Sequence, residues 1–72
     1  MDIKNLIKTD TKKLLVLLTE EELSNVLKLL EEANECRLLD EVESTAYSIY
    51  KKKPGFVDPY DAFYYAYLEW IK

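Results

Sequence analysis

Histidine is absent from this chain of 72 residues, and cysteine and glycine occur once each, as Cys36 and Gly55. Without histidine, the usual general base near neutral pH is missing. Cys36 has no histidine to activate it, and one glycine cannot form the glycine-rich loop that holds a phosphate. We therefore expect no catalytic residues, no enzymatic activity and no cofactor, and we interpret Cys36 as a buried or half-buried structural thiol.

A lone cysteine also excludes an internal disulfide, which is typical of proteins in the reducing cytoplasm. The longest unbroken run of aliphatic residues covers only Leu14 to Leu18. A membrane-spanning helix needs about 20 apolar residues. The residues after Met1 lack the sustained apolar stretch of a signal peptide. These absences predict a cytoplasmic protein with no membrane partner.

Residues that break regular structure are few, because the chain has only one glycine and two prolines. Strands have little support, since few segments alternate apolar and polar residues. The composition, 49% hydrophobic and 33% charged, is typical of a folded chain and not of a disordered one. We predict a single small helical domain over residues 1–72. Its fold should be all-α, a compact bundle of three to five short helices with an aromatic-rich C-terminal helix.

The clearest helix boundary is at Thr19. The residues from Thr19 to Glu22 match a capping box, in which the threonine hydroxyl and the glutamate carboxylate each accept a backbone hydrogen bond. Leu18 and Leu23, on either side of the cap, match the positions of a hydrophobic staple. The predicted helix then continues with an apolar stripe formed by Leu23, Val26, Leu27, Leu30 and Ala33.

A second apolar stripe follows, rotated by roughly 100° from the first; it consists of Leu38, Leu39, Val42, Ala46 and Ile49. The change of register predicts a turn or kink between Asn34 and Arg37. Asn34 is the predicted C-terminal cap, because asparagine tolerates the left-handed conformation. The next helix should run to about Lys52 and end before Pro54 and Gly55.

At the N-terminus, Ile3, Leu6 and Ile7 indicate a short amphipathic helix. The segment from Thr9 to Thr11 is expected to interrupt it. The apolar run from Leu14 to Leu18 predicts a further helical turn or two, with a buried strand as the alternative.

All nine aromatic residues follow position 46, and six of them lie in the last thirteen residues. Asp58 and Pro59 are suited to the cap and first position of a last helix. At 100° per residue, one broad face of this helix is predicted to be core; it comprises Tyr60, Phe63, Tyr64, Tyr67, Leu68 and Ile71.

The other side of the last helix carries Ala62, Tyr65, Ala66 and Trp70. Two alanines four residues apart allow a second helix to approach closely, and tyrosine and tryptophan are typical interface residues. We predict that these four residues contact a partner. The partner is either another protein or, in a homodimer, a second copy of this chain. The alternative is that the last helix lies at the centre of the bundle and is covered by the N-terminal segments.

The formal charge of −4 is unevenly distributed: residues 20–43 alone carry −7, whereas residues 1–19 carry +2. Carboxylates along two consecutive helices can imitate nucleic-acid phosphates and occupy the basic groove of a nucleic-acid-binding protein. Small inhibitors encoded by phages and mobile elements work in this way. The predicted partner-binding acids are Glu31, Glu32, Glu35, Asp40, Glu41 and Glu43.

The alternatives for the charged residues are less specific. The acids match no metal-binding spacing, so we expect no metal site, and many helices present an equally acidic solvated face. Direct nucleic-acid binding through Lys51–Lys53 and the tyrosine-rich helix is disfavoured, because the chain is acidic and the basic cluster is short. The favoured function is therefore a non-enzymatic regulator or inhibitor that binds another protein.

Overall fold

The computed structural model describes residues 3–52, 55 and 57–71, apart from the side chain of Lys4. A single 3-10 turn, η1 (Ile3–Asn5), precedes four α-helices: α1 (Thr9–Leu15), α2 (Glu20–Glu35), α3 (Leu39–Lys52) and α4 (Pro59–Trp70). The described residues contain no strand. The prediction of an all-α bundle of three to five short helices with an aromatic-rich last helix is confirmed.

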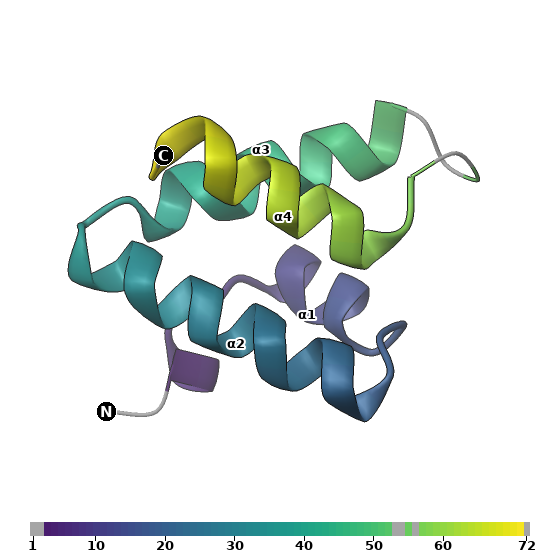
Figure 1. Ribbon diagram of the computed structural model, residues 1–72, viewed down its shortest axis with the longest axis horizontal. Coiled ribbons are helices and arrows are strands. Elements are labelled where there is room, and N and C mark those ends of the chain that lie inside the picture. Colours follow the sequence, from purple (N-terminus) through teal and green to yellow (C-terminus); the bar gives the residue numbers. More distant parts are fainter. Residues whose placement is uncertain (1–2, 53–54, 56, 72) are drawn as a thin grey trace.

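The helices pack around one core (Figure 1). α3 and α4 form the most extensive pair, α2 lies against both of them, α1 contacts α3, and η1 contacts α2. Phe63 is the largest fully buried side chain. The other fully buried apolar residues come from α2, α3 and α4, namely Val26, Leu30, Ala33, Val42, Ala46, Ala62 and Ala66. None of the described helices is long and apolar enough to cross a membrane.

The start of α2 agrees with the sequence. The hydroxyl oxygen of Thr19 accepts a hydrogen bond from the backbone N–H of Glu22 at 3.2 Å, and Glu22 Oε1 accepts from the backbone N–H of Thr19 at 3.1 Å. Leu18 and Leu23 are both partly buried against the core. The predicted capping box is confirmed, because both of its hydrogen bonds are made between residues three apart.

The N-terminal segment differs from the prediction. The expected amphipathic helix is only the short turn η1, and the segment from Thr9 to Thr11, expected to interrupt a helix, forms the first turn of α1. The free N–H groups at the start of a helix favour a nearby acid such as Asp10, and Thr11 is buried against the core. Leu14 and Leu15 belong to the last turn of α1, as predicted, but the helix ends there and residues 16–18 lie in a turn. The strand alternative for this segment was wrong.

The turn between α2 and α3 lies where the two apolar stripes of the sequence change register, as predicted. The residue that ends α2, however, is not the predicted Asn34. α2 continues to Glu35, and Arg37 takes the left-handed conformation with φ of 62°. The N–H of Leu38 donates to the Ala33 carbonyl at 2.9 Å, and the N–H of Arg37 donates to the Asn34 carbonyl at 3.0 Å. This pair of bonds is a Schellman motif. The cap at Asn34 was wrong, because Asn34 is still inside α2 and Arg37 takes the left-handed position.

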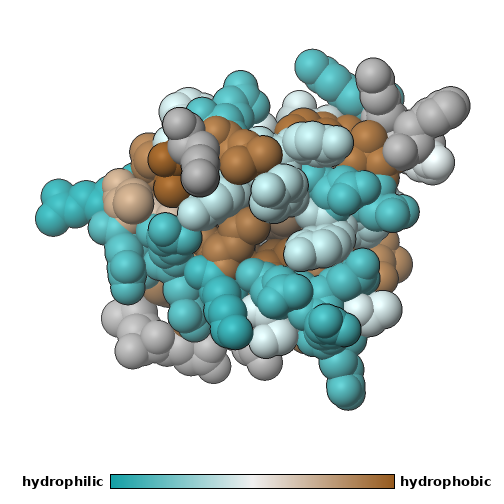
Figure 2. Space-filling model, in the orientation of Figure 1, coloured by the Kyte–Doolittle hydropathy of each residue, from teal (hydrophilic) through white to brown (hydrophobic). Residues whose placement is uncertain are grey.

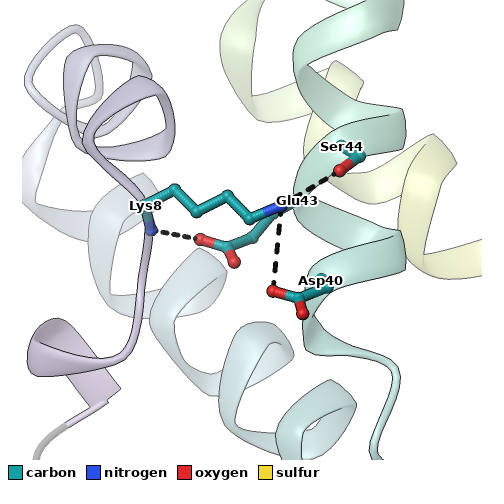
Figure 3. Close-up of polar contacts among 4 residues, drawn as sticks. All are labelled: Lys8, Asp40, Glu43 and Ser44. Carbon is teal, nitrogen blue, oxygen red and sulfur yellow. Dashed lines mark hydrogen bonds and ion pairs between the residues drawn. The ribbon is translucent and has the colours of Figure 1, made fainter.

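A buried carboxylate joins α1 to α3 (Figure 3). Glu43 is 1% exposed, and its Oε1 accepts a hydrogen bond from the backbone N–H of Lys8 at 2.8 Å. Lys8 is the N-cap residue of α1 and makes no side-chain cap of its own. Its Nζ reaches across to Ser44 Oγ at 3.3 Å and to Asp40 Oδ1 at 3.8 Å. A carboxylate of α3 therefore supplies the cap that the α1 sequence lacks.

This position overturns the prediction that Glu43 contacts a partner. In α3, Glu43 lies four residues after Leu39 and three before Ala46, and both of these residues are buried. Helical periodicity therefore places it on the core face of α3. Its acidic neighbours in the sequence do not indicate this, because only the helix register separates a buried acid from a solvated one.

The ends of the last connection follow the sequence where they are described. α3 ends at Lys52, and α4 begins at Pro59 with Asp58 as its N-cap residue, although the Asp58 side chain makes no capping hydrogen bond. Gly55 has φ of 91°, a conformation that glycine adopts without strain. Pro54, predicted to help end α3, lies outside the described residues.

α4 is rotated relative to the prediction. Ala62 and Ala66, predicted to contact a partner, are fully buried, whereas Tyr64, predicted to be core, is 48% exposed. Both predictions were wrong for one reason. The side chains at a helix contact set the interaxial distance, so two alanines let α3 approach α4 closely. The close approach that the alanines indicated thus occurs within the chain, and α4 is covered by α3 and α2.

Substitution of Arg37 by glycine should raise the free energy of unfolding by about 1 kcal/mol, because a side chain in the left-handed conformation is strained and glycine is the preferred residue there. Asn34→Gly is the matched control: it lies inside α2 and should lower stability by a few tenths of a kcal/mol. Urea unfolding measures both. If Asn34→Gly raised the free energy of unfolding and Arg37→Gly lowered it, Asn34 would be the cap.

Ala66→Leu should lower the free energy of unfolding by about 2 kcal/mol, since a larger side chain must force α3 and α4 apart. Tyr65→Leu, on the exposed side of the same helix, should change it by less than about 0.5 kcal/mol. Thermal and urea unfolding provide the comparison. An Ala66→Leu chain as stable as the original would place Ala66 on the surface.

Candidate partner-binding surface

The outward side of α4 carries two exposed tyrosines. Tyr64 and Tyr65 are 48% and 55% exposed, and their ring centroids lie 6.5 Å apart with the ring planes tilted by 55°. Leu68, one turn after Tyr64, is half-buried, and Asp61 and Glu69 are exposed. Aromatic rings exposed side by side, with acids on the same helix, form an amphipathic contact area and not a purely solvated surface.

The outward side of α2 is acidic. Its apolar residues face the core, so that Glu31, Glu32 and Glu35 are left exposed towards the C-terminal half of the helix. One cation, Lys28, lies on the same side. Figure 2 shows hydrophilic side chains gathered along α2, below the paler side chains over α4. The three glutamates lie within four residues of one another and form a local negative field.

Tyr67 joins these two regions. Its hydroxyl donates a hydrogen bond of 2.6 Å to Glu32 Oε2, from α4 to α2. This hydrogen bond, with partial desolvation and the negative charge of Glu32, raises the pKa of Tyr67 above its ordinary value. Tyr64 also lies near enough to Tyr67 to contribute to the shift. Only Glu32 is in direct contact with α4 here, because Glu31 and Glu35 lie farther round α2 and line a hollow with Ile3 and Leu6. We name the exposed acids of α2 and the exposed tyrosines of α4 together the acidic–aromatic surface; it consists of Glu31, Glu32, Glu35, Tyr64 and Tyr65.

The other predicted contact residues lie elsewhere. Trp70 is 44% exposed, and its indole N–H donates to Thr45 Oγ1 at 2.7 Å, so its polar edge is directed to α3. Asp40 pairs with Lys8, and Glu41 is half-buried on α3. Of the six predicted acids, the three of α2 are exposed on one helix, whereas those of α3 differ: Asp40 is exposed, Glu41 is half-buried and Glu43 is buried.

Four exposed residues were not predicted to be exposed. Tyr64 was assigned to the core, and Val16 and Leu17 were assigned to a helical or buried segment, yet Val16 and Leu17 are 79% and 57% exposed. Cys36, interpreted as buried or half-buried, is exposed at the end of α2. A helix that is apolar on nearly every side contains no periodic signal that could have placed Tyr64 outside.

Other chemistries have less support. Within the described part of the chain, no group of three or more acidic or cysteine residues is placed to hold a metal ion. Lys51 and Lys52 are exposed at the end of α3, and Lys53 lies outside the described residues. The acidic–aromatic surface is therefore the candidate site.

Tyr67 should ionise at a pH above the ordinary range of tyrosine in an alkaline titration followed by phenolate absorbance. A raised pKa means that the folded chain holds the phenolic proton more tightly than the unfolded chain. The resulting stability is present below about pH 10 and is lost as the pH rises through the raised pKa. Tyr67→Phe should remove both the late titration and this part of the alkaline destabilisation.

Glu32→Gln is the matched control, because the amide can still accept a hydrogen bond but carries no charge. In this variant, Tyr67 should titrate closer to the ordinary pKa of tyrosine. If neither variant changed the late phenolate titration, the contact between Glu32 and Tyr67 would not exist in solution.

Known proteins provide no comparison for the acidic–aromatic surface. Comparison of the chain with protein-family models, with curated proteins and with solved structures found no match. A function can therefore be inferred only from the side chains that α2 and α4 present, and from the chemistry of a molecule that would complement them.

Proposed function

We propose that this chain is a non-enzymatic binding protein that holds a basic segment of another protein against its acidic–aromatic surface. The observation that carries the proposal is the hydrogen bond from Tyr67 to Glu32, which joins the carboxylates of α2 to the exposed tyrosines of α4. A basic nucleic-acid-binding protein would supply such a segment. The chain would then act as its regulator or inhibitor.

The chemistry of the surface favours arginine over lysine. A guanidinium group stacks on aromatic faces and forms paired hydrogen bonds with carboxylates, whereas an ammonium group is a compact, strongly hydrated charge. Tyr64 and Tyr65 offer ring faces, and Glu32 offers a carboxylate where α2 meets α4. Glu31 and Glu35 extend the negative charge round α2 towards Ile3 and Leu6. An arginine-rich segment would engage both kinds of group at once.

The free energy of a single contact is small, so stable binding requires several contacts. An exposed cation–π contact contributes about 0.5–1 kcal/mol, and an exposed ion pair contributes about 0.2–1 kcal/mol. One arginine would therefore bind weakly, while a segment with several arginines would add such contacts and gain association rate from the acidic field. A groove that binds nucleic-acid phosphates carries several cations close together. We therefore propose a nucleic-acid-binding protein as the partner.

Binding of a synthetic arginine-rich peptide should shift the backbone NMR signals of the second half of α2 and of residues 64–65, and should weaken steeply as salt is raised from ~0.05 to ~0.5 M. Tyr64→Ser with Tyr65→Ser should weaken binding at every salt concentration. Glu31→Gln with Glu35→Gln should weaken it and reduce the salt dependence.

The matched control for charge is Asp10→Asn with Glu20→Gln, which changes the net charge equally at exposed positions outside the acidic–aromatic surface. This control should retain most of the affinity. Equal losses in both charge variants would show that only the net charge matters. Binding that is independent of salt, or shifts confined to other helices, would refute the proposed surface.

A further inference from the structure

The turn between α1 and α2 exposes the two most solvent-accessible large apolar side chains among the described residues. Val16 is 79% exposed and Leu17 is 57% exposed. Beside them lies a hollow of about 310 Å³, whose lining is apolar except for one lysine and consists of Ile7, Lys12, Leu15, Val16 and Leu23. We call this region the α1–α2 corner. It shares no residue with the acidic–aromatic surface.

The α1–α2 corner combines a projection and a recess in one patch. Single exposed apolar residues are common on protein surfaces. Here, however, the exposed Val16 lines a hollow that is large enough for an apolar side chain, and the exposed Leu17 follows Val16 in the same turn. An interface with two-fold symmetry uses the same patch on both molecules, so the patch must complement itself. A projection beside a recess satisfies that requirement.

The charges at the two sides of the corner are opposite. Lys12 and Lys13 are exposed on α1, and Glu20 and Glu21 are exposed at the start of α2, whereas Glu22 is occupied by the capping box. A two-fold axis that lies in the contact plane, between α1 and α2 and perpendicular to the line joining them, places α1 of one copy over α2 of the other. Each lysine pair then faces a glutamate pair of the second copy, which favours association.

The same charges disfavour other occupants. An anionic membrane surface or an acidic segment would meet Glu20 and Glu21, and a basic segment would meet Lys12 and Lys13. Only a molecule with both signs of charge in the reverse order is complementary on both sides. A second copy of this chain is such a molecule by symmetry.

The geometry points to a symmetric homodimer formed through the α1–α2 corner, with Leu17 of each copy in the hollow of the other. The patch is small, so the dimer belongs to the weak class of interfaces and forms in a concentration-dependent manner. The acidic–aromatic surface contributes nothing to this contact, so it stays open for a partner in both copies.

Sedimentation equilibrium of the full chain from ~10 µM to ~1 mM should show a monomer–dimer equilibrium. Leu17→Asp should weaken dimerisation at least ~10-fold, because it places a charge in an apolar hollow. Leu17 is exposed in one copy, so circular dichroism should show an unchanged helix content. The matched control, Tyr65→Asp, puts the same charge on the exposed side of α4 and should dimerise like the original chain.

A charge exchange tests the symmetry. Lys12→Glu should weaken dimerisation, and adding Glu20→Lys to it should restore most of the loss, since each reversed charge again faces its opposite in the second copy. A chain that is monomeric up to ~1 mM overturns the proposal. The proposal is also overturned if the chain dimerises but Tyr65→Asp disrupts the dimer while Leu17→Asp leaves it intact. Titration of the Leu17→Asp chain with the arginine-rich peptide tests the proposed function separately.

Discussion

The close contact between α3 and α4 determines how the remainder of the chain is arranged. Three fully buried alanines, Ala46, Ala62 and Ala66, belong to this pair of helices, and Phe63 is buried next to two of them. Small side chains let helix axes approach, and the interaxial distance in turn decides which large side chains still fit between them. Once Ala62 and Ala66 face inward, helical periodicity turns the neighbouring tyrosines at 64 and 65 towards solvent.

Polar contacts between distant parts of the chain join α1 and α2 to this pair and also link the pair itself. Glu43 caps α1 from α3, Tyr67 bonds to Glu32 on α2, and Trp70 bonds to Thr45. A chain of this length buries a limited core, so directional contacts matter for selecting one arrangement of short helices. Glu43 is the strongest case, since a buried carboxylate is tolerated only where hydrogen bonds replace part of its hydration.

The two candidate interaction surfaces differ in chemistry and in position. The acidic–aromatic surface combines negative charge with ring faces, which suits a basic segment of a different protein. The α1–α2 corner combines a leucine, an apolar hollow and charges of both signs, which suits an identical molecule. Both surfaces have the same physical origin, because a small helical chain cannot bury all of an apolar content of 49%. Four of the exposed large apolar residues, Val16, Leu17, Tyr64 and Tyr65, lie in these two surfaces.

The sequence by itself determined the all-α class, the capping box at Thr19, the end of α3 at Lys52 and the start of α4 at Pro59, because these features depend on groups within about four residues. Only the tertiary structure decided that Arg37 and not Asn34 is left-handed, that Glu43 is buried while Glu31 and Glu35 are not, and that the alanines of α4 face inward and Tyr64 outward. The helix α4 is apolar on nearly every side, so its orientation is chosen by the neighbouring helix that packs most closely against it, and the residues of α4 alone do not contain that information.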